Sequence, residues 1–92
     1  MLTKVFDAET SDGNSDSVEL YGADGVIALS GTWDGATIHV EMTPDGGTTW
    51  IDLAGASYTT DGCRVFTLPA RCQVRLVLSG AGAATVLNGW VG

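Results

Sequence analysis

The segment "DGNSD", which begins at Asp12, has residue types and a spacing that could bind calcium. Asp12, Asn14 and Asp16 stand at alternate positions, as the oxygen ligands of a calcium loop do. Such a loop also needs a glycine at its sixth position and a glutamate at its twelfth, and these positions hold Ser17 and Ala23. We therefore interpret the segment as an acidic loop, and we predict no metal or cofactor site in the chain.

The single histidine, His39, is the only candidate for general acid or base chemistry at neutral pH. It stands in the middle of an expected strand, on the polar face beside Glu41. A general acid or base needs a partner and a pocket, and no nucleophile stands at a known catalytic spacing from it. We predict a surface position for His39 and a protein that is not an enzyme.

The two cysteines, Cys63 and Cys72, lie on neighbouring extended segments on either side of Pro69. If those segments form a hairpin centred near 69–70, Cys63 lies opposite a residue near position 76, which is too far from Cys72 for a disulfide. We predict two free, largely buried thiols. The absence of a C-x-x-C motif or a His/Cys cluster argues against structural zinc.

The stretch "TPDGGTTW" has the spacing T-x-D-x-G-x-x-W and resembles the Asp-box of sialidase-like β-propellers. A propeller needs at least four blades of roughly 40–50 residues, and the chain has 92 residues. We therefore predict a hairpin turn and not a sugar site. Pro44 sets φ, Asp45 accepts hydrogen bonds from its own loop, Gly46 and Gly47 take positive φ, and Trp50 begins the returning strand.

The elements that position these residues are short strands separated by glycine turns. From residue 17 onward they are "SVELYG", "GVIALSG", "TIHVEMT", "TWIDLA", "CRVFTLP", "CQVRLVLSG" and "ATVLNGWV". Apolar and polar residues alternate most clearly over 37–42 and 72–79, so one face of each should be buried. Five Asp-Gly pairs, at 12, 24, 34, 45 and 61, indicate antiparallel hairpins. We predict an all-β protein, an antiparallel β-sandwich of jelly-roll or immunoglobulin-like type with seven or eight short strands and little or no helix.

The first sixteen residues differ from the rest of the chain. The segment "LTKVF" could form an isolated strand, and the acidic, polar "DAETSDGNSDS" follows it. We therefore divide the chain into an N-terminal strand with an acidic loop (1–16) and a β-sandwich domain (17–92). Leu2, Val5 and Phe6 need a surface to pack against, either the edge of the sandwich or a neighbouring subunit.

Charge excludes several partners. Four basic residues against eleven acidic ones give a formal net charge of −7, which disfavours nucleic acid and anionic membranes because phosphate binding needs clustered Lys and Arg. Apolar runs are far shorter than the roughly 20 residues of a membrane span, and the first ten residues lack the apolar core of a signal peptide. We expect the protein to stay in the compartment where it is made.

Two groups of residues are candidates for contact with another protein. Arg64, Arg71 and Arg75 are three of the four basic residues and could dock an acidic partner, or could simply be solvated. Trp33, Trp50 and Trp90 exceed what a thin core needs, and Trp is common at interface hot spots. The candidate interface residues are Leu2, Val5, Phe6, Arg64, Arg71, Arg75 and Trp90.

The stretch "GTWDGATIHVEMTPDGGTTWIDL" followed by "FTLPARCQVRLVLSG" resembles small virion proteins of tailed bacteriophages. The resemblance spans roughly residues 25–80. It implies a β-sandwich module without catalytic activity that decorates the capsid or forms part of the tail.

From this resemblance we expect a capsid decoration (cement) protein that binds the major capsid protein, is made in the host cytoplasm and ends in the virion. A trimer fits the three-fold junctions of a capsid shell. The alternatives are a tail or adaptor subunit, or a carbohydrate-binding virion module that uses Trp33 and Trp50 as a sugar platform.

Overall fold

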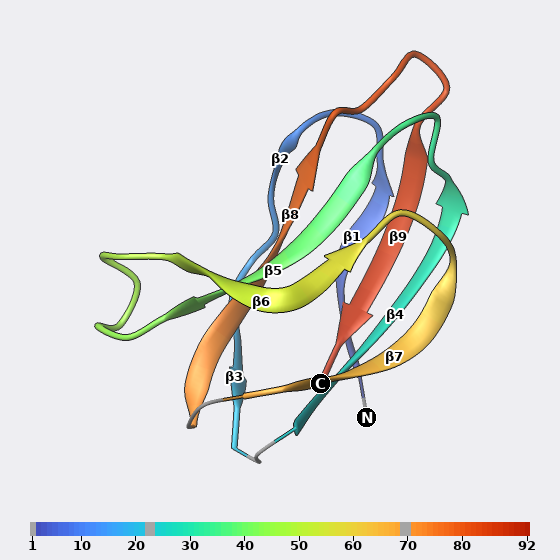
Figure 1. Cartoon of the computed structure of the whole chain (residues 1–92). Coiled ribbons are helices and arrows are strands. Elements are labelled where there is room, and N and C mark those ends of the chain that lie inside the picture. The colour runs from blue at the N-terminus through green and yellow to red at the C-terminus, as the bar shows by residue number, and fades with distance from the viewer. Residues whose placement is uncertain (1, 22–23, 69–70) are drawn as a thin grey trace.

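The computed structural model describes residues 2–21, 24–68 and 71–92, and these residues form two antiparallel sheets packed face to face (Figure 1). One sheet has the strand order β1-β9-β4-β7 and the other has β2-β8-β5-β6, with β3 also paired to β8. The strands are β1 (Thr3–Glu9), β2 (Gly13–Asn14), β3 (Val18–Leu20), β4 (Asp24–Thr32), β5 (Thr37–Thr43), β6 (Ile51–Tyr58), β7 (Gly62–Thr67), β8 (Cys72–Ser79) and β9 (Val86–Val91).

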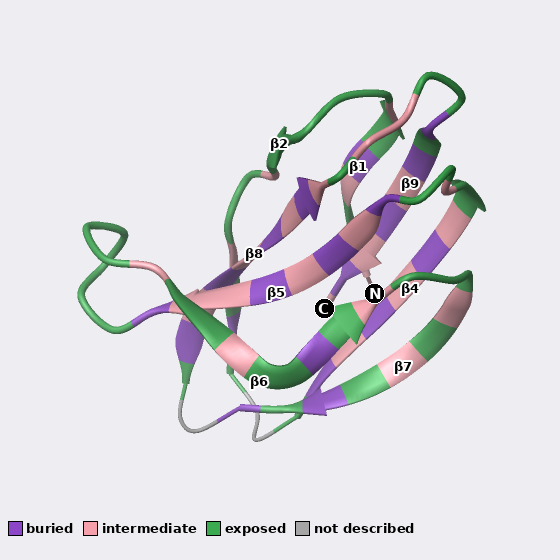
Figure 2. Ribbon diagram, turned by 45° about the horizontal axis from the view of Figure 1, so that its top comes forward, coloured by how far each residue is buried: buried purple, intermediate pink, exposed green. Residues whose placement is uncertain are grey.

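This architecture confirms the predicted antiparallel β-sandwich. The described residues contain no helix. Eight strands correspond to segments that the sequence indicates as extended, and the ninth, β2, has only two residues. The alternation read from β5 and β8 is also confirmed, because Ile38, Val40, Leu76 and Leu78 are buried while their neighbours are partly exposed (Figure 2).

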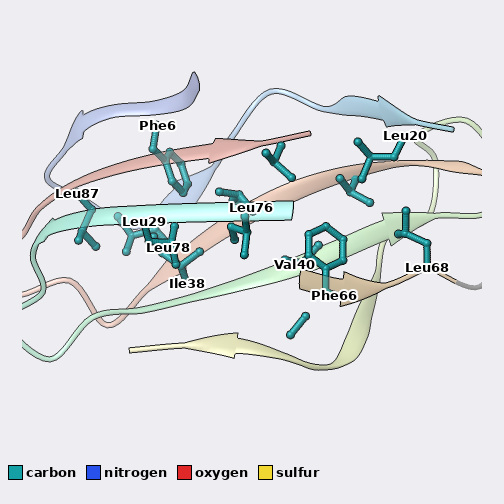
Figure 3. Packing of buried hydrophobic residues seen from close by; sticks show 14 of the residues in the cluster. Phe6, Leu20, Leu29, Ile38, Val40, Phe66, Leu68, Leu76, Leu78 and Leu87 are labelled. Carbon is teal, nitrogen blue, oxygen red and sulfur yellow. The ribbon is translucent and has the colours of Figure 1, made fainter. Parts of the chain in front are cut away.

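The core lies between the two sheets and consists of one cluster of buried apolar side chains (Figure 3). Ile27 and Leu29 of β4 and Leu87 of β9 come from one sheet, and Val40 of β5 and Leu76 of β8 come from the other. All five are at most 3% exposed. The longer strands therefore place one face in the core, so contacts with a partner depend on their outward faces and on the turns.

The N-terminal segment is an edge strand of the sandwich. β1 pairs with β9 with two irregularities in register, and it places Phe6 in the core at 2% exposure (Figure 3). Val5 is partly buried against the same core. Of the two surfaces that the sequence left open for Phe6, the structure uses the sandwich itself, so this residue is not available to a partner. Leu2 is half-buried.

The prediction of a hairpin between the two cysteine-bearing strands is wrong. β7 pairs with β4 in one sheet, whereas β8 pairs with β5 in the other, so the chain crosses from sheet to sheet between them. The predicted turn at 69–70 falls outside the described residues. Both cysteines are free as predicted, but the expectation that both are buried is wrong for Cys63, which is exposed, and holds for Cys72.

Two of the five Asp-Gly pairs do not form the predicted turns with positive φ. Asp24 and Gly25 begin β4, where Gly25 pairs with Phe66 of β7. A Cβ atom at Gly25 would overlap the Phe66 ring, so this glycine gives room for an aromatic side chain to cross the backbone. Gly13 lies in β2. By contrast, Gly35 and Gly46 have φ of 83° and 80°, as a tight turn requires.

Candidate functional site

The turn between β5 and β6 is built by hydrogen bonds to two of its own side chains. Asp45 Oδ1 accepts from the backbone N–H groups of Thr48 and Thr49 at 3.1 and 2.8 Å. Thr43 Oγ1 donates to the same oxygen and accepts from the N–H of Gly47 at 2.8 Å. Gly46 and Gly47 both have positive φ, of 80° and 111°. The spacing T-x-D-x-G-x-x-W thus has a local structural role in this turn.

The Asp45 carboxylate is stabilised in its charged form by these donors. The backbone N–H of Thr49 is the largest cause that lowers the pKa of Asp45 below its ordinary value, followed by the Thr49 side chain. Trp50 completes the turn by donating from Nε1 to the carbonyl of Gly47 at 3.2 Å. No other molecule is needed to satisfy these groups.

The outer face of the β2-β8-β5-β6 sheet carries a network of charged side chains. Glu41 of β5 and Arg75 of β8 are paired across the strands, with Arg75 Nη2 and Nε 2.7 and 2.8 Å from Glu41 Oε1. The guanidinium lies 4.3 Å from the centre of the Trp50 ring. Both charged side chains are about four-fifths shielded, with exposures of 21% and 16%, so water screens this pair only in part.

His39 and Asp52 extend this network toward the sheet edge. His39 Nε2 lies 3.7 Å from Glu41 Oε2 and 3.3 Å from Asp52 Oδ1. Glu41 lies opposite Asp52 in the β5-β6 pairing, and a register irregularity separates this pair from the His39–Ser57 pair. Within the described residues these three form the one group of at least three His, Cys, Asp or Glu side chains close enough to share an ion.

The three arginines do not form one free basic patch. Arg71 pairs with Glu19 at 2.9 Å, and Arg75 pairs with Glu41. Arg64 lies on the other sheet, in β7, where it donates to the carbonyl and hydroxyl of Thr60. The arginines that were candidates for contact with an acidic partner are therefore bonded to groups of the same chain.

All four basic side chains of the chain lie over an aromatic ring. The distances from cation to ring centre are 5.1 Å for Lys4 over Trp90, 5.1 Å for Arg64 over Tyr58, 4.4 Å for Arg71 over Tyr21, and 4.3 Å for Arg75 over Trp50. Such contacts stabilise by about 0.5–1 kcal/mol at exposed sites. The sequence does not show these pairs, because the partners are distant in the chain except for Arg64 and Tyr58.

The outer face of the β1-β9-β4-β7 sheet is different, because its centre is uncharged. Ala28 of β4 has Cys63 of β7 on one side and Trp90 of β9 on the other, and Val26 lies beside Val65 in the next outward row. We call Val26, Ala28, Cys63, Val65 and Trp90 the Trp90 face. None of the five is acidic or basic, and Val65 is 65% exposed.

The Trp90 face is the surface that sequence reasoning found only in part. Trp90 itself was a candidate for protein contact, but Val26, Ala28 and Val65 were not. Alternation could not assign them, since in "GVIALSG" the residues on both faces of the strand are apolar. Their outward direction depends on how β4 is placed between β7 and β9.

The two tryptophans suggested as a sugar platform lie at opposite ends of β5. Trp33 precedes this strand, and Trp50 lies just before β6, after the turn that follows β5. Figure 1 shows that this turn and the start of β5 are at opposite ends of the strand. The seven residues of β5 extend about 20 Å at roughly 3.3 Å each. In addition, Trp33 Nε1 donates to Asp61 at 2.8 Å, and Arg75 covers the Trp50 ring. The two indoles therefore cannot bind one sugar together.

The acidic loop is tied along the edge of β8. Asp12 accepts a hydrogen bond from the N–H of Ala81 at 2.8 Å. Ser15 exchanges two hydrogen bonds with Leu76, one from its backbone N–H and one to its hydroxyl. The segment that contains Asp12, Asn14 and Asp16 therefore runs alongside β8, and its central residues form the short strand β2.

An open groove lies at the end of the β2-β8-β5-β6 sheet where β5 ends and β8 begins. It has a volume of about 280 Å³ and is lined by Glu19, Thr43, Pro44, Gly46, Arg71, Cys72 and Gln73. Burial raises the pKa of the thiol of Cys72, one of the lining residues, and this disfavours the reactive thiolate. The groove therefore lacks an activated nucleophile at this cysteine.

Searches of protein-family models, curated proteins and solved structures find no match to this chain. The described residues also include no helix that is long and apolar enough to cross a membrane. The fold and its surfaces define a small β-sandwich in which one outer face has charged central residues and the other has uncharged central residues, with the Lys4–Asp7 pair beside them.

Proposed function

We propose that this chain is a virion structural protein of a tailed bacteriophage, a decoration module that binds the capsid lattice. The observation that carries the proposal is the Trp90 face. On a chain with a formal net charge of −7, it offers adjacent apolar side chains and no carboxylate. Val65 and Cys63 are exposed, and Val26, Ala28 and Trp90 are partly exposed. Adjacent apolar side chains that reach the surface of a small protein are typical of a protein contact surface.

The size of the face suits docking of a small module. A specific protein interface removes about 800 Å² from each partner, which is about one sixth of the 4737 Å² accessible surface of this chain. One outer face of a two-layered sandwich can supply that area. Each Å² of apolar surface removed from water contributes about 25 cal/mol, and a lattice repeats a weak contact many times.

The opposite face suits the outside of a particle. Its arginines, Arg71 and Arg75, are paired with carboxylates of the same chain. The remaining acidic side chains therefore make the electrostatic potential of this face negative. Net negative charge on an outer surface keeps particles apart. We expect three copies around each three-fold junction, since a closed cyclic trimer matches that symmetry.

The direct test is binding to emptied, expanded capsids assembled from the major capsid protein encoded in the same genome. A Val65→Glu variant places a charge at a position of the Trp90 face that is 65% exposed, in the edge strand β7, and we expect it to lower capsid affinity at least tenfold. The matched control is Ile51→Glu, which changes an exposed aliphatic residue of β6, in the other sheet, and should bind like the wild type.

Equal binding by both variants would place the contact elsewhere. Absence of a major capsid gene from the encoding genome, or no binding to capsids, would overturn the proposal. Binding to purified tails in that case would favour the tail or adaptor alternative, and specific signals on a glycan array would favour the carbohydrate-binding alternative.

A further inference from the structure

The cluster of His39, Glu41 and Asp52 has the geometry of three ligands around one small cation. The three ligand atoms all lie within 4.8 Å of one another. His39 Nε2 is 3.3 Å from Asp52 Oδ1 and 3.7 Å from Glu41 Oε2. In a tetrahedral zinc site with bonds of about 2.0–2.1 Å, two ligand atoms are roughly 3.3–3.4 Å apart. Small side-chain movements would therefore close the cluster around an ion.

The position of Glu41 within the cluster is set by other residues. Its Oε1 is held by two nitrogens of Arg75, at 2.7 and 2.8 Å, and the guanidinium of Arg75 lies 4.3 Å from the centre of the Trp50 ring. The second oxygen, Oε2, is the one that faces His39. Partners that hold one oxygen of a carboxylate and orient the other are a regular feature of protein metal sites.

The composition of the cluster selects the class of ion. One imidazole nitrogen and two carboxylate oxygens suit zinc and neighbouring divalent transition metals, whereas calcium needs six to eight oxygens and magnesium retains most of its water. Asp52 is exposed at 71%, so an ion there would be open to water, with room for a fourth ligand. The cluster thus resembles an open three-ligand site in its donor set.

We propose that His39, Glu41 and Asp52 bind a divalent transition-metal ion, for which Zn²⁺ is the probe. This replaces the expectation, drawn from the sequence, that the chain has no metal site. The ion would join β5 to the edge strand β6 beside the register irregularity that separates His39 from Glu41. The proposal stands independently of capsid binding, since it concerns the opposite outer face.

The single histidine makes the test direct. Untagged protein is titrated with Zn²⁺ in a non-chelating buffer that contains excess Mg²⁺, so that general attraction of cations to an acidic chain is already saturated. We expect the imidazole proton resonances of His39 to shift to a saturable end point at one ion per chain. The thermal unfolding midpoint should rise in the same range of Zn²⁺ concentration, because the ion binds the folded form.

Variants separate the cluster from the rest of the surface. We expect His39→Gln to abolish the rise in unfolding midpoint, and Asp52→Asn to weaken Zn²⁺ binding at least tenfold. The control is Asp24→Asn, which removes one negative charge from β4 in the other sheet and should bind Zn²⁺ like the wild type. Circular dichroism without metal checks that each variant keeps the β-sheet spectrum.

The proposal is overturned if the His39 resonances do not respond to Zn²⁺ under these conditions. It is equally overturned if Asp52→Asn and Asp24→Asn lower the Zn²⁺ affinity by the same factor. In that case the affinity would depend only on the net charge of the chain. Failure of this test leaves the capsid experiment unaffected, since that experiment changes residues of the Trp90 face.

Discussion

At corresponding central positions, the outward side chains of the two sheets have opposite chemistry. On β5 and β8 the cross-strand neighbours are Glu41 and Arg75, and on β4 and β9 they are Ala28 and Trp90. The charged pair has its partners within the chain, so a docking protein would have to desolvate charges that are already satisfied. Beside the Trp90 face, the Lys4–Asp7 pair is much more exposed and lies on the edge strand β1, so the desolvation cost is smaller there. The Trp90 face is therefore better suited to association with a protein, and the face with Glu41 and Arg75 is better suited to contact with water or an ion.

The largest expected effect comes from the core that the two faces share. Leu76 of β8 is fully buried and reaches the opposite sheet, since a Cβ atom on Gly89 of β9 would lie 3.0 Å from Leu76 Cδ1. Leu76→Ala should lower the free energy of unfolding by about 2–5 kcal/mol.

The comparison variant for Leu76 is Val65→Ala, on the Trp90 face. Val65 is 65% exposed, so its truncation should change the free energy of unfolding by less than about 0.5 kcal/mol. Urea denaturation measures both variants. A large loss for Val65→Ala would mean that this face stabilises the single chain, and it would weaken the argument that the face is kept for a partner.

A smaller difference is expected between two basic residues that each cover a tryptophan. Arg75→Met breaks an ion pair that is about four-fifths shielded from water and keeps apolar packing on Trp50, and it should lower the free energy of unfolding by about 1–2 kcal/mol. Lys4→Met makes the same change over Trp90, where the ion pair with Asp7 is much more exposed, and it should cost less than about 0.5 kcal/mol.

A double-mutant cycle of Arg75→Met with Glu41→Gln gives the energy of the pair itself. High salt should reduce that coupling only in part, because the pair is shielded. If Lys4→Met lowered the free energy of unfolding as much as Arg75→Met, the ion pairs of the two faces would contribute equally to stability, contrary to this comparison.

A pH effect is expected at the turn that joins β5 and β6. The pKa of Asp45 is lowered in the folded chain, first by the N–H of Thr49, so its contribution to stability is complete above the unfolded pKa near 3.9. That contribution is lost as the pH falls through the lower folded pKa. Asp45→Asn should therefore be less stable than the wild type at neutral pH, and the difference should shrink in acid.

Carbon-detected NMR of the Asp45 carboxyl group measures this pKa directly. We expect a titration midpoint below the ordinary value for aspartate. A midpoint at or above that value would show that the donors of Thr48 and Thr49 do not hold the carboxylate in solution.

The last expected difference is in the reactivity of the two cysteine thiols and not in the stability of the fold. Cys63 is exposed on the Trp90 face, whereas Cys72 is buried and burial raises the pKa of its thiol. A thiol reagent should therefore label Cys63 quickly and Cys72 much more slowly. Mass spectrometry after brief labelling checks this. Loss of Cys63 labelling on capsid binding would place the contact on the Trp90 face, and equal labelling of both cysteines in the free chain would contradict the fold.

The sequence alone determined the features that depend on neighbours along the chain. Alternation in 37–42 and 72–79 predicted which side chains face the core, because the period of a strand is two residues wherever it lies in a sheet. Gly46 and Gly47 predicted a turn with positive φ for a similarly local reason, since few other residues adopt that conformation at low cost.

Only the tertiary structure decided how the strands are paired and therefore which side chains meet. β7 and β8 are consecutive, yet they lie in different sheets, because burying both inner faces in one core matters more than pairing neighbours. The same pairing brings Asp52 to His39, Arg75 to Trp50 and Ala28 to Trp90. Contacts between distant residues depend on register and sheet order, and neither is encoded in the periodicity of a single strand.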